Sequence, residues 1–168
     1  MNYVLIDASY FIFYRVFALK VWWKNKFKED TLDNPYENDI FKKKFIDLFQ
    51  SKLKEIQKKY KNYKMIVCLD CPRKDIWRNT IYKDYKQTRI SDDSTGNFFR
   101  LVRDLDLFTK SGIQTIISHP YLEADDCIAV ITNHLFKKDK NNNIVIITSD
   151  QDYLQLFNLE NKENLFIV

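Results

Sequence analysis

Four short runs of apolar, largely β-branched residues are the feature that most constrains the fold of this 168-residue chain. Such runs are typical of strands buried on both faces, as in a parallel sheet. They occupy residues 3–6, 65–69, 113–117 and 144–147, and amphipathic helical patterns lie between them in residues 41–60, 98–108 and 123–136. Strands that alternate with helices predict an α/β fold, a three-layer α/β/α sandwich with a mainly parallel central sheet and right-handed crossovers.

The composition fits one domain of this kind. A chain of this length with 45% hydrophobic residues can bury one continuous core and is too short for two comfortable domains, so a single domain over residues 1–168 is expected. The formal net charge of +4 is compatible with a polyanionic partner but is weak evidence for one. Residues 22–38 and 89–97 show no clear period and are expected to be mobile loops.

The cysteines and the hydropathy pattern exclude several classes of protein. Cys68, Cys71 and Cys127 form no even disulfide framework, and no signal peptide precedes the first strand, so an intracellular protein is expected, cytoplasmic or nucleoid-associated. The single C-x-x-C pair has no second pair and no histidine at ligand-like spacing, which argues against a zinc site. No apolar stretch approaches the roughly 20 residues that span a bilayer, so no membrane is expected as a partner.

Acidic residues follow every predicted strand. Asp7 and Asp70 end the first two strands, and parallel pairing would bring both carboxylates to the carboxyl edge of the sheet, where open α/β sheets bind ligands. Five further acids follow the third and fourth strands: Glu123, Asp125, Asp126, Asp150 and Asp152. Any one of the aspartates at a helix start is more often a helix cap than a ligand.

The acids taken together predict a metal site. Like charges about 4 Å apart repel by roughly 4 kcal/mol even at an effective dielectric constant of about 20, so several carboxylates at one edge need a cation. Oxygen ligands without histidine or cysteine favour the hard ions Mg²⁺ or Mn²⁺. A pair of such ions is the usual apparatus for the attack of water on a phosphodiester, and two ions are expected here.

A basic and aromatic segment follows Asp70. It interleaves cationic residues with aromatic ones, among them Arg78, Tyr82, Tyr85, Lys86 and Arg89. Cations neutralise phosphates and aromatic rings stack on bases, so the segment suits a nucleic-acid strand. A solvated charged helix whose tyrosines pack inward explains the composition equally well, and the closeness to the acidic edge favours the nucleic-acid interpretation.

Four blocks of this sequence resemble the 5′ nuclease domain that bacterial DNA polymerase I shares with bacteriophage 5′ exonucleases and flap endonucleases. They are LIDASYFIFYR, WRNTIYKDYKQTR, LEADD and IITSDQDYLQL, in the order and with the spacing of that family. The resemblance implies a PIN-like, resolvase-like α/β fold that binds two Mg²⁺ or Mn²⁺ ions. It also implies hydrolysis of phosphodiester bonds in DNA with a 5′ end or a single-stranded flap, as in DNA replication and repair.

The resemblance also implies roles for individual residues. The metal-site positions of the family correspond to Asp7, Asp70, Glu123, Asp125, Asp126, Asp150 and Asp152. Lys86 and Arg89 match a catalytic basic pair at the scissile phosphate. Tyr85, and less closely Tyr82, match aromatic positions that stack on the terminal nucleotide, while Arg15 and Arg78 match arginines that contact phosphates.

The sequence also departs from the family. Glycines usual before the acidic helix and in the fourth motif are replaced, and the chain ends at Val168, before the family's last metal motif and its helix-turn-helix module for duplex DNA. The expectation is therefore a catalytic core that is a fragment, one piece of a split enzyme completed by a second polypeptide, or a domain adapted to another partner. Two alternatives stay open: a PIN-like ribonuclease, and a non-catalytic nucleic-acid-binding or assembly subunit with an incomplete metal site.

Overall fold

The computed structural model describes residues 1–28, 32, 34–83, 85, 86, 93–158 and 162–168. The chain forms two compact units. The first comprises Met1–Phe11, Tyr60–Thr88 and Ile113–Val168, and the second comprises Ile12–Lys59 and Arg89–Gly112. The expectation of a single domain over the whole chain stays a prediction.

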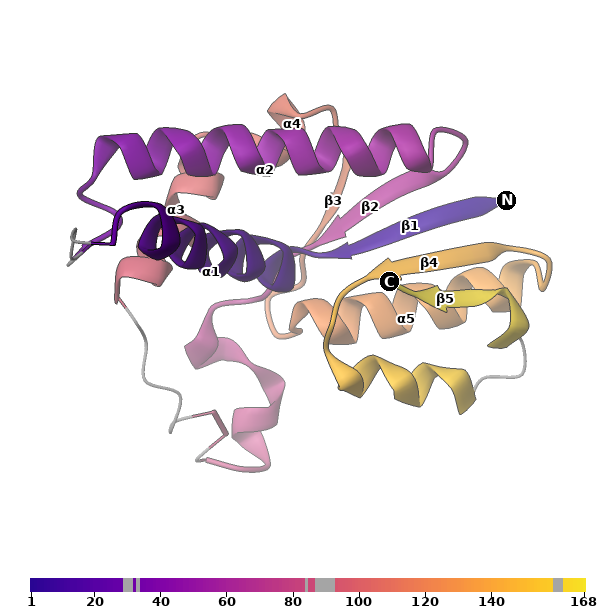
Figure 1. Ribbon diagram of the computed structural model, residues 1–168. Coiled ribbons are helices and arrows are strands. Elements are labelled where there is room, and N and C mark those ends of the chain that lie inside the picture. The colour runs from indigo at the N-terminus through magenta and orange to yellow at the C-terminus, as the bar shows by residue number, and fades with distance from the viewer. Residues whose placement is uncertain (29–31, 33, 84, 87–92, 159–161) are drawn as a thin grey trace. The chain divides into compact units, whose positions relative to one another are not determined.

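The first unit holds a parallel sheet of five strands in the order β3-β2-β1-β4-β5 (Figure 1). The strands are β1 (Asn2–Asp7), β2 (Lys64–Cys68), β3 (Thr115–Ile117), β4 (Asn143–Ile147) and β5 (Leu165–Ile167). The four predicted strands are confirmed with small changes at their ends, and β5 was not predicted. The α/β fold class with its parallel sheet is confirmed.

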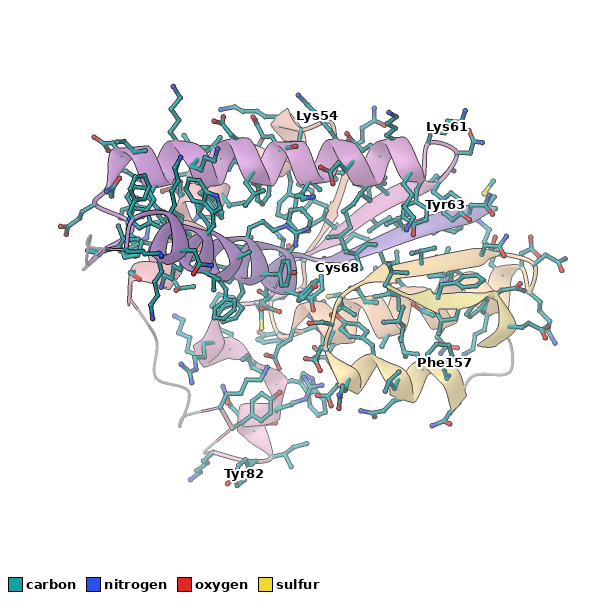
Figure 2. All side chains as sticks on the ribbon, viewed as in Figure 1. Lys54, Lys61, Tyr63, Cys68, Tyr82 and Phe157 are labelled. Carbon is teal, nitrogen blue, oxygen red and sulfur yellow. The ribbon has the colours of Figure 1, made fainter. Side chains whose placement is uncertain are left out.

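The core of the first unit lies between the sheet and α5 (Ala124–Lys138), which packs against β1 and β2. Leu5 and Ile146 from the sheet, Ile128 from α5 and the thiol-bearing Cys68, labelled in Figure 2, belong to one buried cluster. The strand β1 is buried along almost its whole length. All three cysteines are free and buried.

Four helices belong wholly or mainly to the second unit: α1 (Ala8–Lys26, with residues 8–11 in the first unit), α2 (Asp39–Lys59), α3 (Asp93–Asp104) and α4 (Leu107–Lys110). Aromatic rings fill its core, with the ring centroids of Phe45 and Phe98 4.8 Å apart and those of Phe49 and Phe108 5.0 Å apart. No helix within the described ranges is long and apolar enough to cross a bilayer.

Three predictions about this unit need correction. Residues 22–26 belong to α1, so the predicted loop 22–38 is wrong there. The helix was not recognised because apolar side chains lie on nearly all its sides and hide the helical period. Residues 93–97 of the predicted loop 89–97 begin α3, while residues 89–92 lie outside the described part. The predicted helix 98–108 is broken, because Asp106 adopts a left-handed conformation with φ of 49° between α3 and α4.

Short 3-10 helices complete the first unit. Two of them, η1 (Arg73–Asp75) and η2 (Trp77–Thr80), lie in the basic segment after β2. The longest, η3 (Gln151–Asn158), follows β4 and carries Phe157, labelled in Figure 2, and η4 (Lys162–Asn164) precedes β5. Both η2 and η3 lie beyond carboxyl ends of strands, so their side chains can reach the edge where the acids were predicted.

Candidate metal centre and basic segment

The strand order places the candidate site at the point where the sheet reverses its direction of growth. From β1 the chain adds β2 and β3 on one side and then β4 and β5 on the other. Ligands of open parallel sheets bind beyond the carboxyl ends of the strands at such a point. All seven predicted metal ligands belong to the first unit, and four of them follow the carboxyl ends of the central strands: Asp7, Asp70, Asp150 and Asp152.

Asp7 is the last residue of β1, and its side chain is buried and hydrogen-bonded on both oxygens. Oδ1 accepts from the backbone N–H of Tyr10 at 3.0 Å, and Oδ2 accepts from the hydroxyl of Tyr153 at 3.0 Å. Burial raises the pKa of Asp7 to about 6, the two hydrogen bonds oppose that rise, and the charges of Asp70 and Asp125 add to it. A buried acid that still titrates close to neutral pH is typical of functional sites.

Asp70 links the end of β2 to the start of α5. Its Oδ1 accepts from the backbone N–H of Ala124 at 2.6 Å, and its Oδ2 accepts from the hydroxyl of Ser9. The first N–H groups of a helix have no partner within the helix, so a carboxylate at this point satisfies one of them and benefits from the helix dipole. Asp70 is thereby held next to the acids of α5.

Three acids at the start of α5 form the tightest acidic cluster in the described part of the chain. One oxygen from each of Glu123, Asp125 and Asp126 lies within 4.8 Å of the other two, so the three side chains are close enough to approach a shared cation. Burial raises the pKa of Asp125, a backbone bond from Asp126 opposes that rise, and the Asp126 charge adds to it. These three predicted ligands are therefore brought together by one helical turn.

The basic segment contacts this cluster directly. Both terminal nitrogens of Arg78 donate to Asp126 at 2.7 Å, and one also donates to Glu123 at 3.0 Å. The Lys86 ammonium donates to the other oxygen of Glu123 at 2.6 Å. The indole N–H of Trp77 adds a bond to Asp126 at 3.0 Å, and the Tyr85 hydroxyl adds one to Glu123 at 2.9 Å.

The contacts hold the cations in their charged form. Burial opposes the charge of Arg78, but the hydrogen bonds to Asp126 and the surrounding acids outweigh it and raise the pKa of the guanidinium. The balance is the same for Lys86, where the contact to Glu123 outweighs burial and raises the pKa of the ammonium. Lys86 adopts a left-handed backbone conformation with φ of 56°, which a lysine rarely adopts without compensating contacts.

Asp150 follows β4, Asp152 lies in the first turn of η3, and both are exposed. The N–H of Asp150 donates to the Thr148 hydroxyl at 3.1 Å, and the N–H of Asp152 donates to Oδ1 of Asp150 at 2.9 Å. Among the described residues, the two acids are not members of the group of Glu123, Asp125 and Asp126, whose oxygens all lie within 4.8 Å of one another. Their assignment as metal ligands stays a prediction.

The other predicted nucleic-acid residues have different surroundings. Tyr82 is 60% exposed and lies at the outer end of the basic segment (Figure 2). Arg15 is buried in the second unit, with its guanidinium carbon 5.3 Å from the Tyr14 ring centroid. Arg89 lies outside the described residues.

The acids fit a hard divalent cation. The donors are carboxylate oxygens from neighbouring elements, without a thiolate or imidazole among them, which is the set that Mg²⁺ or Mn²⁺ prefers. Arg78 and Lys86 neutralise part of the same charge, so a cation that binds Glu123 and Asp126 competes with them for oxygens. Side chains that donate hydrogen bonds to the acids hold them in place, as is common around metal ligands.

Sequence reasoning missed three residues that contact the acids: Ser9, Trp77 and Tyr153. Ser9 and Tyr153 stand within two of the motifs that suggested the family, but neither side chain carries a charge that marks it as functional. An aromatic residue within an apolar run is interpreted as a core residue, and Tyr153 does belong to the buried core cluster. The sequence offers one signal for the role of Tyr153. A phenylalanine could fill the same position in the apolar run, so a tyrosine there indicates that the buried hydroxyl has a hydrogen-bond partner.

Comparison with known proteins places these observations in a family. A family described as "5'-3' exonuclease, N-terminal resolvase-like domain" matches residues 2–166. A 5'-3' exonuclease of Buchnera aphidicola subsp. Acyrthosiphon pisum is 32% identical over 117 residues, which are 67% of this chain and 40% of the relative. The corresponding protein of Buchnera aphidicola subsp. Baizongia pistaciae is 29% identical over 161 residues, which are 95% of this chain and 47% of the relative. The chain thus spans less than half the length of these curated relatives.

Solved structures show the same fold. A T5 protein co-crystallised with metal ions superposes with a TM-score of 0.62 at 19% identity, over 93% of this chain and 51% of that chain. The T5 5'-exonuclease with bound zinc ions gives a TM-score of 0.60 at 18% identity, over 93% and 52%. At this identity the likeness concerns the fold, and it confirms the expected PIN-like α/β architecture.

Proposed function

The chain belongs to the family of 5'-3' exonuclease N-terminal, resolvase-like domains, and on this premise we propose that it is the metal-binding catalytic core of a 5′ nuclease that hydrolyses phosphodiester bonds in DNA. The observation that carries the proposal is the cluster of Glu123, Asp125 and Asp126, with Asp70 bonded to the start of the same helix. A divalent cation bound there supplies a Lewis acid that stabilises charge on phosphate oxygens.

The proposed metal ligands are the seven acids that the sequence predicts. Asp125 is the best candidate for direct contact with the metal ion. Its side chain is 31% exposed, and its carboxylate is 3.9 Å from the guanidinium of Arg78, farther than the carboxylates of Asp126 and Glu123 are. Asp126 and Glu123 have their oxygens engaged by Arg78 and Lys86, so these two acids bind a cation by exchanging one positive partner for another. Two Mg²⁺ or Mn²⁺ ions are proposed for the whole set.

The basic segment is proposed to hold the phosphate strand. Lys86 and Arg89 would contact the scissile phosphate, and Arg15 and Arg78 would contact neighbouring phosphates. The exposed ring of Tyr82 and the ring of Tyr85 would stack on bases. A cation on the acids frees Arg78 and Lys86 for phosphate oxygens, which couples metal binding to substrate binding.

The substrate and partner are proposed more specifically. A 5′ end or a single-stranded flap of DNA fits a segment that offers aromatic rings for stacking and cations for phosphates. The matched regions cover only 40% and 47% of the curated relatives, which supports the proposal that grip on duplex DNA and further acids come from an additional segment, in the same or in a second polypeptide. Roles in DNA replication and repair follow for such an enzyme.

The experiment that tests the proposal is cleavage of a 5′-flap DNA duplex and of an RNA of the same sequence, with Mg²⁺ and with Mn²⁺. We expect cleavage of the DNA, and a loss of roughly 100-fold for Asp125→Asn, because removing a ligand removes stabilisation of the transition state. The matched control is Asp139→Asn, an exposed acid at the other end of α5, which should leave the rate unchanged.

Each other result has a definite meaning. Preferential cleavage of the RNA would make the chain a PIN-like ribonuclease. Equal cleavage rates for the wild type and Asp125→Asn would show that the acidic cluster takes no part in the reaction. Binding of the flap without cleavage by any preparation would favour a nucleic-acid-binding subunit.

A further inference from the structure

Tyr153 joins two parts of the acidic edge that are far apart in the sequence. It lies on η3, is 3% exposed, and its hydroxyl donates to Oδ2 of Asp7 at 3.0 Å across a sequence separation of 146 residues. The hydroxyl is thus buried against a carboxylate that ends the central strand of the sheet.

The ring of Tyr153 is held in place independently of this bond. It belongs to the buried cluster that contains Leu5, Cys68 and Ala124. A phenylalanine would fill the same volume, whereas the hydroxyl of a tyrosine must find an acceptor when it is buried. Because the ring cannot move freely, the hydroxyl is presented to Asp7 in a fixed direction.

Asp7 is restrained from both sides as a result. The N–H of Tyr10 fixes Oδ1 at 3.0 Å and the hydroxyl of Tyr153 fixes Oδ2. A carboxylate oxygen accepts more than one contact, so each oxygen keeps capacity for a cation. The two donors therefore set the rotamer of Asp7 without using up its ability to bind.

The same bond ties down the segment that carries the two exposed acids. Asp152 directly precedes Tyr153 in η3, and the backbone N–H of Tyr153 also bonds to the Asp150 carbonyl at 3.4 Å. Through η3, the hydrogen bond of this tyrosine side chain to Asp7 joins the segment with Asp150 and Asp152 to the end of β1. Loss of the hydroxyl would loosen both ends of the contact.

We propose that Tyr153 is a positioning residue of the metal centre: its hydroxyl orients the Asp7 carboxylate and fixes η3, with Asp150 and Asp152, against the carboxyl end of β1. The inference rests on the proposed function, because it assumes that these acids bind the cation. Hydrogen-bond partners of ligating carboxylates commonly change metal affinity by about 10- to 100-fold when they are removed.

The test compares Tyr153→Phe with Tyr3→Phe in the chain of 168 residues. Tyr3 is a matched control, because it belongs to the same core cluster and its hydroxyl donates to the Met1 sulfur at 3.3 Å, at the opposite end of β1. Mn²⁺ binding is measured by calorimetry without DNA, and flap-DNA affinity is measured without metal. We expect Tyr153→Phe to weaken Mn²⁺ binding by about tenfold, Tyr3→Phe to leave it unchanged, and neither to change DNA affinity.

A double-mutant cycle on the metal-free protein checks that the effect passes through Asp7. Tyr153→Phe should lower the unfolding midpoint in the wild type and have a much smaller effect in Asp7→Ala, which lacks the acceptor, because the two side chains share one contact. Equal Mn²⁺ affinity of the two tyrosine variants, or additive effects in the cycle, would overturn the positioning role while leaving the nuclease proposal intact. A wild-type chain that binds no Mn²⁺ would instead overturn the proposed function, and the positioning role with it.

Discussion

At the scale of single residues, Asp7 illustrates the conflict between a metal centre and stability. Its carboxylate is buried beside two other acids, and its hydrogen bonds do not compensate fully for burial, so its pKa rises from 3.8 to about 6. The native protein without a bound cation therefore carries an ionised group in an unfavourable place at neutral pH. Such sites are commonly less stable than a neutral replacement.

The first prediction is that Asp7→Asn stabilises the metal-free protein at neutral pH. Because the folded pKa is raised, the unfavourable contribution is absent below the ordinary pKa of 3.8, grows as the pH rises, and is complete above about 6. At pH 7.5 the variant should have a larger free energy of unfolding, by up to roughly 3 kcal/mol. Urea denaturation at pH 4 and pH 7.5 checks this, and a gain of the same size at both pH values would contradict it.

At the scale of elements, the start of α5 and the basic segment depend on each other. Arg78 from η2 bridges Asp126 and Glu123, and Trp77 bonds to the same Asp126. Asp126 also accepts from the N–H of Glu123 at 3.2 Å, so one carboxylate caps the helix and anchors the segment. A change in what the acids bind is therefore transmitted to the residues that would hold the phosphate strand.

The second prediction is that Arg78→Gln tightens Mn²⁺ binding and weakens binding of single-stranded DNA. Removing the guanidinium removes a competitor for the acids, and for a partly exposed ion pair the gain should be roughly threefold to fivefold, equivalent to less than about 1 kcal/mol. Calorimetry with Mn²⁺ and a DNA-binding titration measure both effects. Lys74→Gln, an exposed cation in η1, is the control for loss of charge alone. Weaker Mn²⁺ binding by Arg78→Gln would mean that the arginine organises the acids instead of competing for them.

The third prediction concerns the break between α3 and α4. Asp106 is exposed and has φ of 49°, a conformation that glycine adopts without strain. We expect Asp106→Gly to raise the free energy of unfolding by up to about 1 kcal/mol. In contrast, Asp104→Gly at the end of α3 should lower it, since glycine weakens a helix. Thermal denaturation compares the two variants, and destabilisation by both would show that the left-handed conformation carries no strain.

At the scale of the whole molecule, the elements predicted from the sequence are those with a clear pattern. The four strands and the helices α2 and α5 follow from apolar runs and helical spacing. The helix α1 was missed because its apolar side chains surround it, so no face stands out. The strand β5 was missed because it has only three residues, too few for any period.

The acids of the candidate site were predictable for a similar reason. Each one follows a recognisable strand, and parallel pairing brings strand ends to one edge whatever the loops do. The contacts of Arg78 with Asp126 and of Tyr153 with Asp7 were not predictable, because they depend on the paths of η2 and η3. Those paths are set by turns and packing, which leave no period in the sequence.

The central position of β1 has a consequence for how the protein is made. The strand β1 pairs on one side with β2 and on the other with β4, whose residues 143–147 are synthesised about 140 residues later. Pairing over such a separation is slow to form and cannot begin before β4 has been synthesised. Asp7 therefore meets Tyr153 only after residues 143–153 have been synthesised, so the acidic edge is assembled long after its first acid has left the ribosome.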